Sequence, residues 1–278
     1  MSKVTSREGL LAGSVLTGLV WGALTVAAAA QVPDFGAKDS VGWIGMGGEF
    51  LPLPGPGPKP LTFDPKYPYV PNNTGAQPTF RIADLTNPNL KPWVKERMKK
   101  DNDEVIAGKI AFTARSSCMM AGVPNFNGFG GAQPYYFIQT PKQVWMIYSG
   151  DQQVRRVYLD VRHSENPKPS WYGESVGHYE GGDTLVVDTI GLNDKTVVDP
   201  YRTPHTTKLR VVERYKLIEN GAQMEVMFTV DDPDAFYEPW SADRRFRRVA
   251  LPYYEEVCAE GNRMLFDYNI PKADKPDF

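Results

Sequence analysis

The feature that most constrains the fold is a series of alternating apolar and polar residues that begins near Pro134 and continues almost to the end of the chain. A period of two is typical of β-strands with one buried face, and turn residues separate the segments. Because no helical pattern interrupts the series, we expect consecutive antiparallel hairpins in a mainly β domain. The segments are 134–140, 143–149, 154–161, 174–190, 206–218, 223–230 and 244–251.

Closing such hairpins into an antiparallel, lipocalin-like β-barrel removes the unpaired edges of the sheet, and we predict this fold. A β-sandwich is the alternative that the same pattern allows. Between two of the strands, Asn220-Gly221 supplies a turn sequence that hairpins favour. The barrel domain is expected to comprise residues 89–278, including one helix.

Ahead of the strands, the sequence predicts an extended arm and then a single helix. Residues 31–88 are rich in Pro and Gly, most of all in 51–58, which predicts the arm. Its apolar residues favour an arm that wraps the domain, with a flexible tether as the alternative. Residues 89–108 combine helical apolar spacing with a terminal Gly108, which predicts the helix.

Residues 1–30 have the pattern of a signal peptide. Lys3 and Arg7 precede an uncharged apolar stretch that ends in alanines before Gln31, which predicts cleavage after Ala30. An uncleaved membrane anchor is the alternative, because a stretch of this length can span a bilayer. We therefore expect a periplasmic or secreted protein with no membrane span after cleavage.

Composition and motifs bear on the classes of partner and cofactor. The 31 Lys and Arg are scattered among 33 Asp and Glu, and the net charge is only −2, so no nucleic-acid partner is expected. The chain contains no G-x-G-x-x-G or C-x-x-C motif and no phosphate-binding loop. No cofactor is therefore predicted. The sequence does not indicate an oligomeric state.

The two cysteines, Cys118 and Cys258, are predicted to form a disulfide, because an exported chain enters an oxidising compartment. Their positions in the sequence do not show that they meet. Two buried free thiols are one alternative. A reactive Cys258 is another, although the glutamates beside it would raise the pKa of its thiol.

Histidine is scarce in this chain and draws attention to candidate chemistry. The three histidines, His163, His178 and His205, all lie in the β-rich part. A zinc ion held by all three, with an open fourth position, is a minor alternative, because the unequal spacing matches no compact metal motif. His163 lies in the loop 162–170, where a surface role and a catalytic role are both open.

The hairpin around Gly181-Gly182 supplies two further candidates. A two-residue turn there would set His178 opposite Leu185, on a core face with apolar neighbours. A buried imidazole needs a hydrogen-bond partner, in a structural or a catalytic role. The opposite face carries Asp188 beside Tyr179, so either face can line a cavity.

The strand that begins near His205 carries the most informative pair. Val211 and Tyr215 share one face with Glu213, while basic residues occupy the other. An ionised carboxylate is costly to bury alone, so Glu213 must be paired, protonated or facing a wet pocket. If the strand starts early enough, His205 faces the same interior, and the two residues could act as acid and base. The alternative is a structural Glu213 that pairs with an inward arginine.

Several motifs resemble a large family of exported bacterial β-rich proteins that are mostly hypothetical. The motifs are R-R-V-Y-L-D (155–160), W-Y-G-E-S-V-G (171–177), D-T-L-V-V-D-T (183–189), V-V-E-R-Y (211–215) and D-D-P (231–233). They cover about residues 134–258. The resemblance implies candidate site positions at His163, Asp188, His205 and Glu213, and no general mechanism. Where the family's turn reads E-G-D-T, this chain has an additional glycine.

The leading functional hypothesis is a cofactor-independent lyase, isomerase or hydratase that acts on a small apolar or aromatic molecule inside the barrel. Histidine and Glu213 would move protons, and Arg156 would hold developing negative charge. A periplasmic carrier for an apolar molecule is the main alternative, and an envelope-associated role for the arm is a third. Aromatic residues would bind the ligand, and we expect these to be Tyr158, Trp171, Tyr179 and Tyr215.

Overall fold

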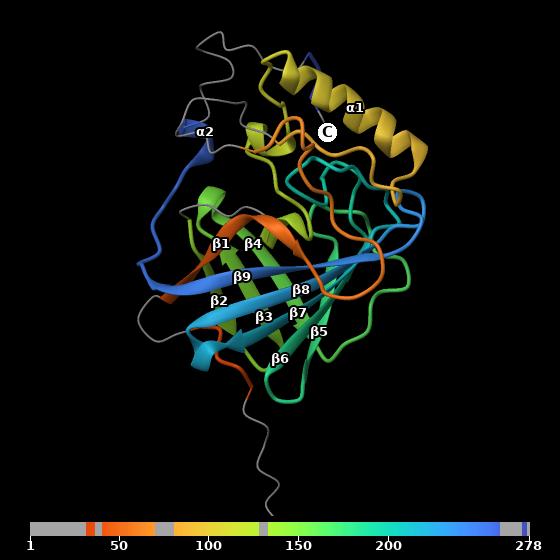
Figure 1. The fold of residues 1–278 in the computed structure, drawn as a ribbon. Helices are drawn as coiled ribbons and strands as arrows, with labels where there is room; N and C mark the ends of the chain where they lie inside the picture. Colours follow the sequence, from red (N-terminus) through yellow and green to blue (C-terminus); the bar gives the residue numbers. More distant parts are fainter. Residues whose placement is uncertain (1–31, 37–40, 70–80, 128–132, 262–273, 277–278) are drawn as a thin grey trace, which may run out of the picture. The chain divides into compact units, whose positions relative to one another are not determined.

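The strands form a closed barrel in which neighbours along the chain are also neighbours in space (Figure 1). The structure, a computed structural model, describes residues 32–36, 41–69, 81–127, 133–261 and 274–276, so the expected signal peptide lies outside the described residues. A barrel, and not a sandwich, is confirmed. Its strands are β1 (Val41–Pro52), β2 (Tyr135–Gln139), β3 (Gln143–Tyr148), β4 (Gln153–Leu159), β5 (Glu174–Glu180), β6 (Thr184–Ile190), β7 (Arg210–Ile218), β8 (Gln223–Asp231) and β9 (Trp240–Ala250).

One pair of neighbouring strands is parallel. β4 and β5 pair Val157 with Ser175 and Leu159 with Gly177, whereas the other neighbours in the described barrel are antiparallel. The expectation of antiparallel hairpins throughout is therefore wrong at this step. Residues 160–173 form a long connection, which a parallel pair requires and a hairpin does not.

The segment predicted as an arm contributes a strand to the barrel. β1 pairs with β9 over most of its length and meets β2 where Trp43 lies opposite Tyr135. Because glycine and proline conceal the strand pattern here, the prediction of an arm does not hold for β1. Elsewhere in the segment, Leu61 is buried and Phe63 is 39% exposed, so the chain packs on the domain only in part.

Two hydrophobic clusters make up the core. In the first, inward-facing side chains of the strands pack with Phe35 and Phe126 from flanking segments. Packed side chains, many of them aromatic, therefore occupy much of the interior in which the sequence places a ligand cavity. The strand residues of this cluster are Trp43, Tyr135, Phe137, Val144, Met146, Tyr148, Val157, Leu159, Leu185, Val187, Tyr215, Met224, Val226 and Phe246.

The second cluster joins the strands to α1 (Pro92–Ile106), which confirms the predicted helix. Val94 and Met98 of α1 share this cluster with Phe228 and Trp240 of β8 and β9. None of the described helices is long and apolar enough to cross a membrane. The shorter helical turns are η2 (Ala114–Ser117), η3 (Asn125–Asn127), η4 (Gly150–Gln152), η5 (Glu219–Gly221) and α2 (Cys258–Gly261).

Candidate functional site

A fully buried ion pair joins β4 to β7 inside the barrel. Nη1 of Arg155 donates to Oε1 of Glu213 at 3.0 Å, and Nη2 donates to Oε2. The hydroxyl of Tyr215 also donates to Oε1, at 2.9 Å. Both charged side chains are 0% exposed. The inward face predicted for Glu213 is confirmed, and the carboxylate has the inward arginine partner of the structural alternative.

Hydroxyl groups extend this network to β5 and β6. Nη2 of Arg155 donates to Ser175 Oγ at 3.2 Å and to Thr189 Oγ1 at 2.8 Å. Burial by itself lowers the pKa of Arg155, but the charge and hydrogen bond of Glu213, together with Tyr215 and Tyr172, outweigh burial and raise this pKa above its usual value. Buried charges are tolerated only when they are paired, and Glu213 pairs with Arg155. Since the partners of Arg155 lie on β5, β6 and β7, the network links four strands of the barrel.

The network borders a pocket beside the parallel strands β4 and β5. This pocket, here called the seam pocket, has a volume of about 320 Å³. Three residues predicted to bind a ligand or charge, Arg156, Tyr158 and Trp171, all line it. The seam pocket is lined by Met120, Val154, Arg155, Arg156, Tyr158, Ser170, Trp171, Tyr172, Gly173 and Ser175.

Glycine and hydrogen bonds fix the rim of the seam pocket. Gly173 has a φ of +60°, and a Cβ at this position would lie 2.3 Å from the carbonyl oxygen of Ile190, so only glycine fits. The hydroxyl of Tyr172 donates to Oε1 of Gln153. Nε2 of Gln153 donates in turn to the carbonyl oxygen of Met119, at 3.5 Å. The rim is thus tied to the neighbouring loop.

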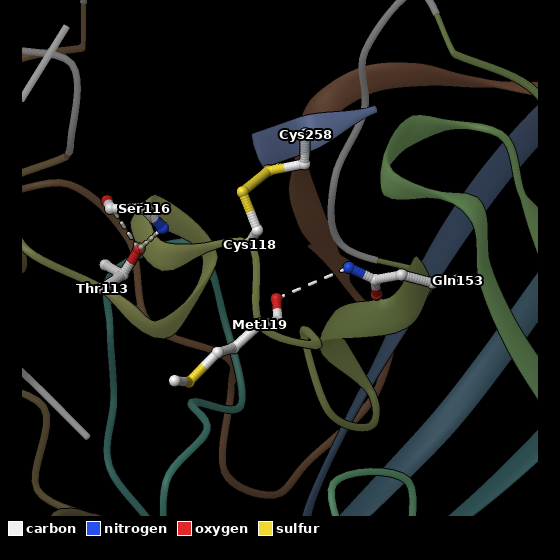
Figure 2. Close-up of a disulfide and its surroundings, with 6 residues drawn as sticks. All are labelled: Thr113, Ser116, Cys118, Met119, Gln153 and Cys258. Atoms are coloured by element: carbon white, nitrogen blue, oxygen red, sulfur yellow. Dashed lines mark hydrogen bonds between the residues drawn. A yellow bond between two sulfur atoms is a disulfide. The ribbon is translucent and has the colours of Figure 1, made fainter. Parts of the chain in front are cut away.

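The predicted disulfide between Cys118 and Cys258 is confirmed (Figure 2). It joins the loop after η2 to the C-terminal segment. At the start of η2, the hydroxyl of Thr113 accepts a hydrogen bond from the backbone N–H of Ser116 and caps the helical turn. Because Met120 follows Cys118 in this loop, the disulfide and the bond to Gln153 both anchor one wall of the seam pocket.

Alternation along β4 separates Arg155 from Arg156. Arg155 faces the interior together with Val157, whereas Arg156 is exposed and lies over the ring of Trp145, 5.3 Å from its centroid. The sequence assigned the interior cation to Arg156, and the structure gives this place to Arg155. A signal for Arg155 was present, because it shares the strand face of apolar Val157 and Leu159.

Ser175 is a further residue that sequence reasoning missed. It is the central residue of G-E-S-V-G (173–177), the pattern of a nucleophile elbow in α/β-hydrolases. Such an elbow requires a strand-to-helix turn, but Ser175 lies within β5. Its Oγ contacts Arg155 and Thr189, so the geometry is that of a side chain that positions the guanidinium.

His163 and Asp188 converge on the outer face of the barrel. His163 Nδ1 lies 3.0 Å from Glu174 Oε1, and its Nε2 lies 3.6 Å from Asp188 Oδ2. Arg210 donates to both carboxylate oxygens of Asp188, at 2.9 and 2.7 Å. These contacts fasten the connection 160–173 to the strands. The two residues do not line the seam pocket.

His178 lies on the outer face as well, so its predicted place in the core is wrong. The turn between β5 and β6 holds three residues, and Tyr179 instead of His178 lies opposite Leu185. The His178 side chain is 51% exposed, with Nε2 3.2 Å from Glu180 Oε1. The additional glycine shifts the register by one residue, which moves each side chain of β5 to the face opposite to the predicted one.

His205 is buried but does not join the ion pair. β7 begins at Arg210, so His205 precedes the strand and does not start its inward face. Its Nε2 lies 2.8 Å from Thr196 Oγ1, and its Nδ1 lies 2.8 Å from the carbonyl oxygen of Thr206. Burial lowers the pKa of the imidazole. The geometry describes a structural histidine rather than the predicted partner of Glu213.

Two of the predicted ligand-binding aromatic residues belong to the barrel core. Tyr215 is buried beside Glu213, and the half-buried Tyr179 accepts a hydrogen bond from Nε2 of Gln139 at 2.8 Å. The three histidines lie in three separate environments. Across the ranges that the structure describes, no group of three or more His, Cys, Asp or Glu is placed to hold a metal ion.

Comparison with protein-family models gives no match, and no curated protein is significantly similar to this chain. The class of the protein therefore comes from its geometry. The described residues form a closed barrel of mixed strand direction, with a buried ion pair and an aromatic-lined pocket at its parallel seam.

Proposed function

We propose that the protein binds a small apolar or aromatic molecule in the seam pocket. The observation that carries this proposal is the lining, in which the aromatic residues Tyr158, Trp171 and Tyr172 accompany the exposed cation Arg156. Sites for small ligands combine apolar or aromatic walls with a few fixed polar groups, in volumes of about 300 to 1,000 Å³. A volume of about 320 Å³ suits a molecule with a single ring.

Arg156 supplies the polar specificity of the proposed site. Its guanidinium is already oriented by the ring of Trp145, 5.3 Å from the ring centroid, so less conformational entropy is lost when a ligand contacts it. A guanidinium attracts an oxygen atom or the face of an aromatic ring. Arg155 and Ser175, which are 1% and 2% exposed, close the base of the pocket.

The proposal also places the protein outside the cytoplasm, in the periplasm or secreted. The disulfide between Cys118 and Cys258 belongs to a type of bond that persists in oxidising compartments and is rare in the cytosol. The signal-like pattern of residues 1–30 and the resemblance to exported bacterial proteins support the same placement. A carrier for an apolar or aromatic molecule is the corresponding role.

Acid–base catalysis, as in a lyase, isomerase or hydratase, is a second function for the same site. The hydrogen bond of 2.9 Å between Tyr215 and Glu213, next to Arg155, favours it. Binding is better supported, because Glu213 is 0% exposed and a substrate would have to displace Arg155 or Ser175 to reach it. If a metabolite screen identifies a substrate, Tyr215→Phe should lower its turnover about 10²- to 10⁴-fold in protein that stays folded.

The binding function is tested by NMR titration of the purified protein with single-ring probes, namely toluene, phenol and benzoate. At least one of them should bind, and Trp171→Ala should weaken its binding about tenfold or more. Tyr237→Ala is the matched control, because Tyr237 is 59% exposed and does not line the seam pocket. Binding that survives Trp171→Ala, or the absence of binding by all three probes, would contradict the proposal.

A further inference from the structure

The loop that contains Cys118 lines a second cavity next to the seam pocket. This cavity, here called the loop pocket, lies between that loop and residues 195–202 and has a volume of about 50 Å³. Its lining combines apolar residues with the charged residues Arg115, Lys195, Asp199 and Arg202. The apolar residues are Ala114, Met120, Ala121, Val197 and Pro200, and Asn125 also lines the cavity. Because Met120 lines both pockets, they lie within the reach of one side chain.

The walls of the loop pocket are held in place by close packing. Gly122 has a φ of +77°, and a Cβ there would lie 2.4 Å from Thr196 Oγ1, so the two loops are in direct contact. Thr196 Oγ1 lies 2.8 Å from Nε2 of the buried His205. The disulfide of Cys118 anchors the other loop. The cavity is therefore formed before any ligand arrives.

Asn125, which lines this cavity, carries an unused hydrogen-bond acceptor. Its side chain is 1% exposed, and in the described structure no donor reaches its Oδ1. Buried polar atoms in native proteins nearly always have a hydrogen-bond partner. An unused acceptor in the lining of a preformed cavity marks the place where a ligand donates a hydrogen bond.

We propose that the ligand of the seam pocket extends past Met120 into the loop pocket and donates a hydrogen bond to Oδ1 of Asn125. This inference rests on the proposed function of the seam pocket. The volumes of the two pockets indicate which part of the ligand each one holds. The seam pocket, of about 320 Å³, accepts a ring, whereas the loop pocket, of about 50 Å³, accepts only a few non-hydrogen atoms. In this proposal the connecting atoms of the ligand are aliphatic and pack on the apolar part of the lining, Ala114, Val197 and Pro200.

The ligand class that follows is a single aromatic ring with a short aliphatic side chain that ends in a hydroxyl or another small donor. Met120 is the residue that the side chain of the ligand must pass. It is 39% exposed and unbranched, and a methionine side chain changes rotamer easily. In this proposal the passage opens by a change of the Met120 rotamer.

Three probes test this inference in NMR titrations of the disulfide-bonded protein. Toluene occupies the seam pocket alone, 3-phenylpropan-1-ol adds a chain with a donor, and the methyl ether of this alcohol adds a chain without one. We expect the alcohol to bind about tenfold more tightly than the ether. Asn125→Leu, which removes the acceptor, and Val197→Phe, which fills the loop pocket, should each bring the ratio of the two affinities close to one.

Val197 is only partly buried, so Val197→Phe keeps the test informative if Asn125→Leu fails to fold. Toluene separates the two proposals. If toluene binds and Trp171→Ala weakens it, but alcohol and ether bind equally in the wild type, the seam pocket stands and the extension into the loop pocket is wrong. An affinity ratio that neither variant changes would also overturn the extension. If toluene does not bind, the proposed function itself has failed.

Discussion

Arg155 and Glu213, which lie 58 residues apart in the sequence, form a bidentate ion pair in which neither side chain reaches solvent. The pair belongs to different strands that are not neighbours in the barrel, β4 and β7. Since Ser175 and Thr189 on the intervening strands also bind the guanidinium, the four strands share one polar cluster.

Arg155→Met should lower the free energy of unfolding by about 3 to 5 kcal/mol, because it leaves the Glu213 carboxylate buried without a cation. The double variant Arg155→Met/Glu213→Leu should recover most of this loss, since it removes both charges. Urea denaturation of the wild type, the two single variants and the double variant gives the coupling energy. Simple addition of the two single losses would show that the residues are not coupled.

Cys118→Ser should lower the free energy of unfolding by about 4 to 5 kcal/mol in the loop-entropy account, because the disulfide spans 140 residues. Dithiothreitol should destabilise the wild type by a similar amount and leave the variant unchanged. Thiol titration of the denatured, oxidised wild type should find no free thiol. Two titratable thiols would contradict the pairing with Cys258.

Gly173 and Gly181 share a left-handed backbone but differ in the space around them. Their φ values are +60° and +58°, yet a Cβ would lie 2.3 Å from backbone at Gly173 and 3.7 Å from the nearest atom at Gly181. Gly181→Ala should therefore cost about 1 to 2 kcal/mol, the cost of the backbone conformation alone. Gly173→Ala should cost more and weaken probe binding in the seam pocket. Equal melting temperatures for the two variants would contradict this difference.

Asp199 should make stability depend on pH between about 4 and 6. Burial raises its pKa from 3.8 to about 6, although Tyr201 and Thr203 donate hydrogen bonds to its carboxylate. A group with a raised folded-state pKa contributes stability below its unfolded pKa, and this contribution is lost as pH rises through the folded value. When the pH rises from 4 to 7, the free energy of unfolding of Asp199→Asn should increase by up to about 3 kcal/mol relative to that of the wild type.

Urea denaturation at both pH values measures this gain for Asp199→Asn. The control is Asp194→Asn, because Asp194 lies in the same loop and is exposed. The free energy of unfolding of the control variant should differ from that of the wild type by nearly the same amount at both pH values. A constant difference for Asp199→Asn as well would show that the buried carboxylate does not titrate in this range.

His205 and His178 should differ sharply in their contribution to stability. His205→Ala removes a buried hydrogen-bonding contact to Thr196 and a partly buried one to Thr206, and should lower the free energy of unfolding by about 1 to 3 kcal/mol. His178→Ala changes a half-exposed side chain and should stay within about 0.5 kcal/mol of the wild type. Thermal melting at pH 7 compares them. A larger loss for His178→Ala would mean that the register of β5 differs from the one described.

Burial lowers the pKa of His205 in the folded protein. Its contribution to the free energy of unfolding is therefore present above about pH 6.5 and is lost as pH falls through the folded-state pKa. His205→Gln should therefore lose less stability than the wild type between pH 7 and pH 5. His178→Gln serves as the control. If both variants follow the wild type over this range, the buried imidazole has an ordinary pKa.

Local patterns in the sequence determined the strands after residue 134, the helix at 89–108 and the inward face of Glu213. Each of these depends on a residue and its near neighbours, because alternation with a period of two or the spacing of a helix reports burial directly. Where a local pattern was interrupted, the prediction failed. Glycine and proline concealed β1, and one additional glycine beside Gly181 reversed the face assigned to His178.

The residues that meet at the candidate site were decided only by the tertiary structure. The sequence predicted that Glu213 needs a partner but did not indicate that Arg155, on a strand that is not its neighbour, supplies it. It also gave no sign that β4 and β5 run parallel, and the seam pocket lies beside this pair. Whether a side chain points inward is decided within its own strand. Which inward side chains meet depends on the closure of the whole barrel, which brings residues far apart in the chain into contact.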